Sequence, residues 1–508
     1  MENKFLDVLI VGAGLSGIGA AVHLTKRCPG KSFAIVEGRE RLGGTWDLFR
    51  YPGIRSDSDM YTLGYNFKPW TARKAIADAP TILDYLHETV DEHGLEKHIR
   101  YERKVTNASW SSETARWTVS LTHGDGSTSQ IECNFLFMCS GYYSYEGGHK
   151  PDFKGYSDFA GPIVHPQEWP EDLDYTGKKV VVIGSGATAV TLVPSMAETA
   201  GHVTMLQRSP TYIVSRPAED KFALALRKFL PNKLAYGITR WRNVLYQLFT
   251  FNLARRQPVG FKKKLLEMVR EEMGQGVDMK HFTPTYNPWD QRLCLVPDSD
   301  LFQSLKSGKA SVVTDHIERF VEDGILLKSG EKLEADIIVT ATGLKLVSGG
   351  HAQFEIDGEP VHFGSRFNYK GVMFSDVPNL GMTFGYTNAS WTLKADLTSE
   401  YICRVINTMD RKGAQIAYPH PADGEKLIPE TIVDFSSGYI ERAAADLPKQ
   451  GQKKPWRLNQ NYAKDIVNLR YKTVDDGVMV FAKAGSMSLG ATSEAGKAEP
   501  LNSQPVAA

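Results

Sequence analysis

The chain has 508 residues, more than one hydrophobic core usually organises, so two or three domains are expected. Hydrophobic residues make up 42% and charged residues 23%, a mixture typical of a soluble globular protein and not of a disordered one. Lysine plus arginine and aspartate plus glutamate both number 59, so the overall charge does not attract nucleic acid. We therefore expect a multidomain globular protein without a nucleic-acid partner.

The spacing of the cysteines and the length of the apolar segments indicate whether disulfides, a metal site or a membrane span are expected. The five cysteines are scattered, and no pair has the C-x-x-C spacing of a metal or thiol redox site. No disulfide and no bound metal are expected, and a cytoplasmic location fits best. A strand begins near Asp7, where a secretory signal would lie. The apolar stretch 243–254 is far shorter than the roughly 20 residues that span a bilayer, so membrane contact through it would be peripheral at most.

A first βαβ unit opens the chain. Residues 6–11 predict a strand, residues 16–27 a helix and residues 32–37 a second strand. The glycine-rich turn between the first strand and the helix offers N–H groups and a positive dipole end to a pyrophosphate. Glu37 ends the second strand, where a carboxylate accepts hydrogen bonds from a ribose diol. This context predicts an FAD site that includes Gly12, Gly14, Ser16, Gly17 and Glu37.

A second βαβ unit follows, with a strand at 179–183, a glycine turn, a helix and a strand at 203–207. Its last strand ends in Gln207 and Arg208 and lacks the acidic residue of the first unit. A guanidinium pairs with a 2′-phosphate that a carboxylate would repel, so NADPH is favoured over NADH. The alternative for Arg208 is an ordinary surface arginine. The residues expected to bind NADPH are Gly184, Ser185, Gly186, Ala187, Thr188, Ala189, Gln207 and Arg208.

These two units predict an α/β fold with two Rossmann-like dinucleotide-binding domains and a helical insertion in the second. The expected parts are an FAD-binding domain at 1–147 and 344–483, an NADPH-binding domain at 148–343, the insertion at about 218–290, and a flexible tail at 484–508. The insertion is rich in Lys, Arg, Leu and Phe. Plain surface helices, a lid and a membrane-facing element all remain open for it.

The two expected cofactors describe an enzyme in which hydride passes from a nicotinamide to a flavin. Flavoprotein disulfide reductases carry a cysteine pair just after the first βαβ unit, and this chain has none there. The sequence therefore indicates dioxygen as the electron acceptor.

A further motif lies between the two glycine turns. Phe159, Gly161, His165, Trp169 and Pro170 match each fixed position of the pattern F-x-G-x-x-x-H-x-x-x-W-P. This run resembles the fingerprint of the type I Baeyer–Villiger monooxygenases, which belong to the flavin-containing monooxygenase superfamily. The resemblance extends from residue 6 to about 480, and the segments 43–59 and 455–462 are similar to the branch with the ethionamide-activating monooxygenase.

The resemblance implies an FAD-dependent, NADPH-consuming enzyme that inserts one oxygen atom of O2 next to a ketone carbonyl through a C4a-peroxyflavin. Aliphatic or aryl ketones would then give esters or lactones. An alternative is an S- or N-oxygenase of the same superfamily. A non-enzymatic alternative is a nucleotide-binding redox sensor.

The resemblance also implies site residues. Arg292 falls where the family has its catalytic guanidinium, and Asp57 would pair with it beside the flavin. The alternatives are an ordinary salt-bridged arginine and an aspartate that caps a helix starting near Asp59. Gln291 stands where many members have a lysine, which weakens the expected preference for NADPH. The other residues that the resemblance places at the FAD are Gly44, Thr45, Trp46, Arg55, Ser56 and the backbone of Val105. The segment 378–391 either closes over the isoalloxazine or belongs to the core.

Overall fold

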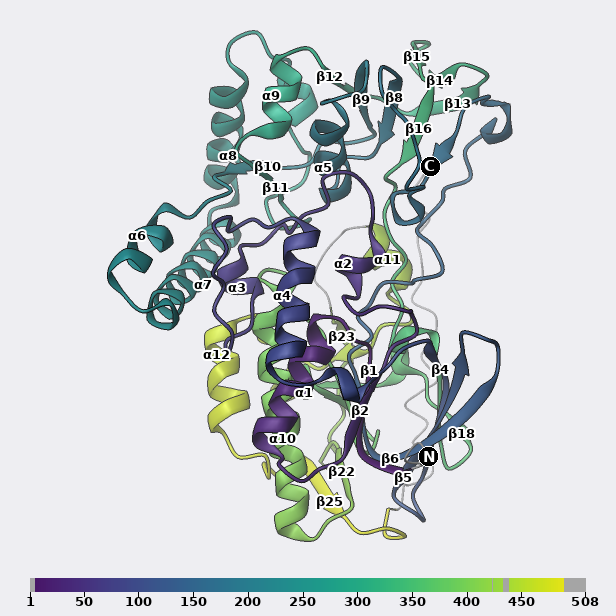
Figure 1. The fold of residues 1–508 in the computed structure, drawn as a ribbon, viewed down its shortest axis with the longest axis vertical. Coiled ribbons are helices and arrows are strands. Elements are labelled where there is room, and N and C mark those ends of the chain that lie inside the picture. Colours follow the sequence, from purple (N-terminus) through teal and green to yellow (C-terminus); the bar gives the residue numbers. More distant parts are fainter. Residues whose placement is uncertain (1–4, 423, 433–437, 488–508) are drawn as a thin grey trace.

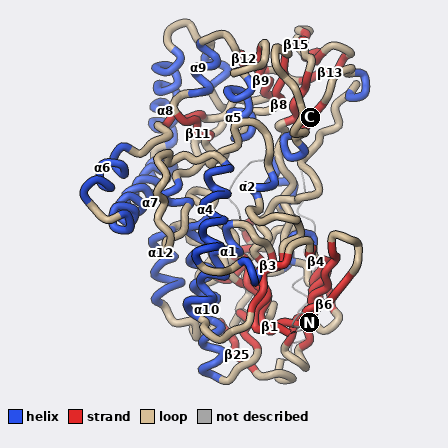
Figure 2. The backbone as a smooth tube through the Cα atoms, viewed as in Figure 1, coloured by secondary structure: helices blue, strands red, loops and turns tan. Residues whose placement is uncertain are grey.

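The structure is a computed structural model that describes residues 5–422, 424–432 and 438–487. Two separate sheets organise it, one near each end of the long axis of the molecule (Figure 1). The helices α6 and α7, whose bounds are given below, project to one side of both sheets (Figure 2).

The first sheet has nine strands in the order β18-β17-β4-β5-β6-β1-β2-β3, and β21 pairs with β6. Its centre is parallel, because β1 pairs in parallel with both β2 and β6. The alternating pattern of β4 and β5 instead suits an antiparallel hairpin. The strands are β1 (Phe5–Val11), β2 (Phe33–Val36), β3 (Ile99–Arg100), β4 (Arg103–Ser111), β5 (Arg116–His123), β6 (Thr128–Met138), β17 (Gln353–Ile356), β18 (Glu359–Pro360) and β21 (Leu380–Met382).

Helices from both halves of the chain cover this sheet. The helix α1 (Leu15–Arg27) packs against α10 (Trp391–Lys412), which lies almost entirely in the interior. The helix α4 (Ala79–Glu92) adds Ile82 and Leu86 to the same core. Strands β17 and β21 and helix α10 thus return to the first sheet, as the sequence predicts for residues after 344. The precise boundaries of the two domains stay predictions.

The second sheet is parallel throughout, in the order β12-β9-β8-β16-β7. This order is that of a Rossmann-like unit, in which the chain moves outward from β8 and then returns to its other side. The helices α5 (Ala187–Met196) and α9 (Asp300–Lys306) pack together beside it. Its strands are β7 (Ile163–Val164), β8 (Lys179–Ile183), β9 (His202–Gln207), β12 (Ala310–Thr314) and β16 (Ile337–Thr340).

The helical insertion bridges the two sheets. It contains α6 (Lys221–Phe229), α7 (Asn232–Arg256) and α8 (Pro258–Met273), and it lies between the paired strands β10 (Ile213–Arg216) and β11 (Cys294–Pro297). Tyr236 and Val244 of α7 belong to the core around α1, whereas Val269 of α8 belongs to the core of the second sheet. The insertion is therefore in the second domain by chain order but packs on both. No described helix is long and apolar enough to cross a membrane.

Short elements complete the described chain. They are α2 (Thr45–Leu48), α3 (Met60–Leu63), α11 (Gly438–Ala443), α12 (Tyr462–Ile466), the single turns η1 (Glu96–His98), η2 (Tyr156–Asp158), η3 (Pro166–Glu168), η4 (Met279–Phe282), η5 (Gly349–His351), η6 (Phe363–Ser365) and η7 (Val467–Tyr471), and the strands β13 (Ile317–Val321), β14 (Gly324–Leu327), β15 (Lys332–Glu334), β19 (Asn368–Tyr369), β20 (Met373–Phe374), β22 (Ile416–Pro419), β23 (Glu430–Thr431), β24 (Lys449–Gln450) and β25 (Met479–Ala482).

The start of the predicted flexible tail is packed. The Gly485 N–H donates to the Ser112 carbonyl at 2.8 Å, and Met487 packs against the core of the first sheet. The prediction of a tail at 484–508 is thus wrong for residues 484–487, because these contacts hold them on the end of β4. Residues 488–508 lie outside the described residues.

Candidate active site

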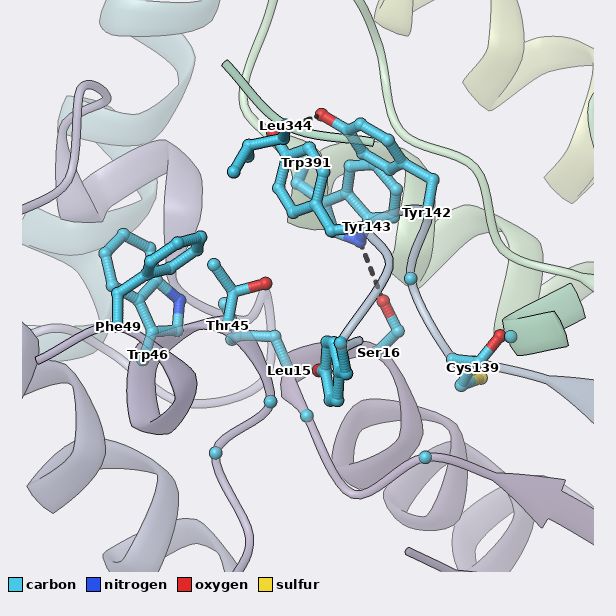
Figure 3. Close-up of a pocket in the computed structure, with 18 of the residues that line it drawn as sticks. Leu15, Ser16, Thr45, Trp46, Phe49, Cys139, Tyr142, Tyr143, Leu344 and Trp391 are labelled. Carbon is cyan, nitrogen blue, oxygen red and sulfur yellow. Dashed lines mark hydrogen bonds between the residues drawn. The ribbon is translucent and has the colours of Figure 1, made fainter. Parts of the chain in front are cut away.

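A cavity of about 500 Å³ receives residues from both glycine turns. Gly12, Gly14 and Ser16 line it from the first turn, and Ala187 and Thr188 line it from the second. Figure 3 shows Trp46 and Phe49 on one side of this cavity and Tyr142, Tyr143 and Trp391 on another. The carboxyl ends of β1 and β8 both lead into it, which is where ligands bind in open parallel sheets.

The first turn is shaped by contacts that only glycine permits. Gly12 has a φ of +103°, and a Cβ there would lie 2.7 Å from the Cys139 carbonyl oxygen. A Cβ on Gly17 would lie 1.8 Å from the Gly12 carbonyl oxygen, so Gly17 serves the packing of α1 on β1 and does not line the cavity. No side chain caps the N-terminus of α1. Its first N–H groups therefore remain for an anionic ligand.

Glu37 lies buried at the end of β2 and also lines the cavity. Its Oε2 accepts a hydrogen bond from the Ala13 N–H at 2.8 Å, and its Oε1 accepts from the Arg39 N–H at 3.0 Å. Burial raises the pKa of this carboxyl group, while these N–H groups act in the opposite direction. Each carboxylate oxygen keeps a second lone pair for a hydroxyl donor.

Gly44, Thr45 and Trp46 line the cavity next to the first turn. A Cβ on Gly44 would lie only 3.0 Å from the Cα of Gly14, so the two loops touch through their glycines. Val105 of β4 is buried and reaches the cavity beside Glu37. The register of β4 against β5 shifts directly after Val105.

Arg55 and Ser56 line the cavity but are partly engaged elsewhere. The Arg55 Nη1 lies 2.5 Å from the Asp300 carboxylate at the start of α9. The Arg55 Nη2 is buried and has no hydrogen-bond partner within the described chain. Ser56 accepts a hydrogen bond from the Ala77 N–H at 3.3 Å. Arg55 thus has a polar atom left for a ligand, and the Ser56 hydroxyl, which accepts this one hydrogen bond, keeps its own proton to donate.

Asp57 and Arg292 meet at the cavity from opposite domains. The guanidinium of Arg292 lies 2.8 Å from the Asp57 carboxylate, and their side chains are 42% and 35% exposed. Both residues line the cavity. Asp57 does not cap the helix α3, because Asp59 accepts the hydrogen bond from the Thr62 N–H. The geometry is therefore that of the pair and not that of the capping alternative; the catalytic roles remain a proposal.

The second turn contributes fewer residues to the cavity than predicted. Gly184 and Ala189 are packed, and a Cβ on Gly184 would lie 2.4 Å from the Ala341 carbonyl oxygen. Ser185 donates a hydrogen bond to the Ser209 carbonyl at 3.0 Å. A Cβ on Gly186 would meet no atom within 4 Å, so the start of α5 faces open space. Within this turn, Ala187 and Thr188 are the residues that line the cavity.

Gln207 and Arg208 lie at the end of β9, and their side chains differ in burial. The Gln207 side chain is buried and donates to the His281 carbonyl at 2.8 Å and to the Thr314 hydroxyl at 2.9 Å. These partners hold the Gln207 amide inside the protein, and the assignment of Gln207 to NADPH stays a prediction. Arg208 is exposed and forms no hydrogen bond or ion pair with other described residues.

Three aromatic residues of the cavity wall were not predicted individually. Tyr142 stacks on Trp391 with ring centroids 5.0 Å apart, and its hydroxyl lies 3.0 Å from that of Tyr143. Trp391 donates a hydrogen bond to the Ser16 hydroxyl at 2.7 Å, the dashed line in Figure 3. Tyr142 and Tyr143 follow strand β6, which pairs in parallel with β1. Residues just after such a strand often line a ligand site, and this position could have identified both tyrosines from the sequence.

The segment 378–391 contributes to both the core and the cavity wall, and its closure over the isoalloxazine stays a prediction. Leu380 is fully buried in the core of the first sheet. Tyr386, Ala389 and Trp391 line the cavity. The described residues contain no cluster of three or more side chains that could hold a metal ion.

His165, from the F-x-G-x-x-x-H-x-x-x-W-P run, lies away from the cavity. Its Nδ1 accepts a hydrogen bond from the Gln167 N–H at 3.2 Å, so its Nε2 carries the proton and donates to the Gly343 carbonyl at 3.3 Å. Burial lowers the pKa of this imidazole. His165 therefore holds the segment that returns from the second sheet to the first.

Comparison with known proteins gives consistent matches. A family model described as flavin-binding monooxygenase-like matches residues 75–348, and one described as an NAD(P)-binding Rossmann-like domain matches residues 10–71. The FAD-containing monooxygenase EthA of Mycobacterium tuberculosis is 54% identical over 484 residues, which cover 95% of this chain and 98% of that protein.

Two solved structures share the fold. The complex of OTEMO with FAD and NADP has a TM-score of 0.72 at 21% identity and covers 95% of this chain and 100% of its own. Cyclohexanone monooxygenase from Rhodococcus sp. Phi1 bound to NADP⁺ has a TM-score of 0.72 at 20% identity, again with 95% and 100% coverage. The α/β fold with two dinucleotide-binding units is thus confirmed.

Proposed function

The chain belongs to the flavin-binding monooxygenase-like family, and we propose that it is a Baeyer–Villiger monooxygenase within that family. As a flavoprotein monooxygenase it uses FAD and NADP(H). In the proposed reaction a ketone, O2, NADPH and a proton give an ester or lactone, NADP⁺ and water. We propose aliphatic or aryl ketones as the substrates, and the cytoplasm as the location.

The residues of the cavity fit these cofactors. The uncapped start of α1 and the buried, unpartnered Nη2 of Arg55 suit phosphate oxygens, and Glu37 suits a ribose diol. The open space at Gly186 leaves room for a second pyrophosphate at the start of α5, with exposed Arg208 for a 2′-phosphate. When bound, FAD and NADPH supply the two electrons with which dioxygen is activated.

The Asp57–Arg292 pair is the observation that carries the proposal. Oxygen attack on a carbonyl carbon develops negative charge on the reacting oxygen atoms, which a nearby cation stabilises. A guanidinium cannot lose its charge by deprotonation at any working pH. The Asp57 carboxylate, 2.8 Å from the guanidinium, holds Arg292 at the cavity between the two glycine turns.

The aromatic wall has a second task in this proposal. Trp46, Phe49, Tyr142, Tyr143 and Trp391 surround the cavity with large, mostly apolar surfaces. Such surfaces exclude water from the reacting atoms and strengthen the field of Arg292. Water would otherwise divert the activated oxygen to hydrogen peroxide.

Isotopically labelled dioxygen tests this proposal. We expect the purified holoenzyme to consume NADPH faster with an aliphatic or aryl ketone and to place one labelled oxygen atom in the ester product. Label found only in hydrogen peroxide would refute it.

The same assay separates the alternative within the superfamily. An S- or N-oxygenase would form labelled sulfoxide or N-oxide from a sulfide or amine and leave ketones unchanged. A redox sensor without turnover does not fit membership in this family of enzymes.

A further inference from the structure

The helical insertion carries an unusual concentration of exposed apolar side chains. Nine of the fifteen large hydrophobic side chains that are exposed in the described chain lie between residues 222 and 259. They are Phe222, Phe229, Leu234, Ile238, Trp241, Leu245, Tyr246, Phe249 and Val259, with exposed fractions from 40% to 84%. A concentration of exposed apolar side chains of this kind marks an interaction site.

Five of these residues form one stripe along α7. Leu234, Ile238, Trp241, Leu245 and Phe249 follow one another at intervals of three or four residues. At about 100° per residue they fall on a single face of the helix, over a length of roughly 22 Å. Figure 1 shows α6 and α7 at the outer edge of the molecule. Of the stripe, Trp241 also contacts Tyr462 of α12, with ring centroids 5.9 Å apart, and keeps 45% of its surface exposed.

The opposite face of α7 is firmly attached to the protein. Tyr236 and Arg240 are buried, and the Arg240 guanidinium donates to the carbonyls of Tyr61 and Gly64, each at 2.8 Å. Asn243 donates to the Asp59 carboxylate at 2.9 Å. The stripe is therefore the outer face of a rigidly mounted helix and not an exposed part of a loose segment.

The charged residues of the same region are all basic. Residues 221–266 contain eleven Lys and Arg and no Asp or Glu, although the whole chain has a net charge of zero. An equal excess of acidic residues therefore lies in the rest of the chain. Lys221, Lys228, Lys233, Arg256 and Lys264 are exposed and form no hydrogen bond or ion pair through their side chains with other described residues.

We propose that this face of α6 and α7 docks onto the surface of an anionic lipid bilayer. An amphipathic helix with aromatic and leucine residues on one side and Lys or Arg beside them binds in the plane of such a surface. Anionic headgroups neutralise the exposed cations, and the acyl region receives the apolar stripe. The site does not depend on the proposed reaction.

A second copy of the chain is a poorer occupant of this face. In a symmetric dimer the same patch would meet itself, so two clusters of unopposed positive charge would be brought together. Residues 221–266 themselves contain no acidic residue that could oppose this charge.

Vesicle sedimentation of the FAD-loaded full-length protein tests the proposal. We expect the protein to sediment with vesicles of phosphatidylcholine and phosphatidylglycerol in equal parts, and to stay in the supernatant with phosphatidylcholine alone. Raising the salt from about 0.1 M to about 0.5 M should weaken the binding, because it screens the charges of the cluster.

Two paired variants locate the contact. The Leu245→Ser/Phe249→Ser and Lys228→Glu/Lys233→Glu variants should each lower the partition coefficient at least about tenfold. The matched controls Tyr156→Ser/Ile428→Ser and Lys154→Glu/Lys328→Glu change exposed residues elsewhere and should bind like the wild type. Unchanged flavin absorbance and far-ultraviolet dichroism check that each variant is folded.

Three outcomes would overturn the proposal. One is an absence of binding to anionic vesicles, and another is equal binding by the helix variants and the wild type. The third is a dimer in vesicle-free solution that Leu245→Ser/Phe249→Ser abolishes while vesicle binding persists, since a second copy would then be the occupant.

Discussion

Arg292 and Asp57 lie far apart along the chain, but the Arg292 guanidinium and the Asp57 carboxylate are 2.8 Å apart. We predict that Arg292→Ala retains NADPH-dependent bleaching of the flavin and loses ester formation at least about 100-fold, because the charge that stabilises the reacting oxygen is gone. Arg292→Lys should restore activity only in part, since an ammonium lacks the planar fork. Stopped-flow absorbance and product analysis measure the two steps separately.

The control for this variant is another exposed arginine near a carboxylate. Arg319 lies 3.7 Å from Asp158 in the second domain, away from the cavity. Arg319→Ala should form ester like the wild type. Normal ester formation by Arg292→Ala would remove this residue from the mechanism.

Single residues differ in how far the sequence reveals them. Glu37 was predictable because its place follows from the glycine turn before it, and the predicted partners Asp57 and Arg292 lie together at the cavity. The orientation of Gln207 was not predictable. Its amide is held by His281 and Thr314, which are 74 and 107 residues away along the chain.

At the scale of single elements, two glycines in helices behave in opposite ways. We predict that Gly17→Ala destabilises the protein by about 1–3 kcal/mol, because the added Cβ meets the Gly12 carbonyl oxygen at 1.8 Å. Gly237→Ala in α7 should instead stabilise it by about 0.5–1 kcal/mol, since the site is helical and has no atom within 4 Å. Denaturant unfolding of the holoproteins gives both values, and equal effects of the two changes would contradict this account.

The attachment of α7 gives a second prediction for an element. Arg240→Met should cost about 3–5 kcal/mol of unfolding free energy, because Asp396 and the carbonyls of Tyr61 and Gly64 lose their buried cation. Arg242→Met on the same helix breaks a partly exposed pair with Asp220 and should cost less than about 1 kcal/mol. Similar losses in both variants would show that burial of Arg240 is not what fixes the helix.

Strands and helices of the two nucleotide units were predictable because their apolar runs and glycine turns are local signals. Residues 179–183, for example, were expected as a strand and form β8. The core against which the helical insertion packs was not predictable from local signals. Its packing on the first core depends on Tyr236 and Val244, which share one buried cluster with residues of α1 and α3 that lie far away along the chain.

For the whole molecule, the two chain crossings between the sheets lie side by side. The Ser144 N–H donates to the Lys345 carbonyl and the His149 N–H to the Gly343 carbonyl, each at 2.9 Å. Gln167 donates to the Ser144 carbonyl at 2.7 Å, and His165 donates to Gly343. The F-x-G-x-x-x-H-x-x-x-W-P run thereby ties both crossings to the second domain.

This position of His165 makes stability depend on pH. Burial lowers the pKa of the imidazole, so the folded protein takes up the proton less readily than the unfolded chain. The contribution of neutral His165 to the free energy of unfolding is complete above the ordinary pKa of about 6.5. This contribution is lost as the pH falls below about 6.5 toward the lowered pKa of the folded protein. We predict that the wild type loses more unfolding free energy between about pH 7.5 and pH 5.5 than His165→Gln does. His87→Gln changes an exposed histidine of α4 and should keep the wild-type slope, whereas equal slopes for all three proteins would exclude His165 as the titrating group.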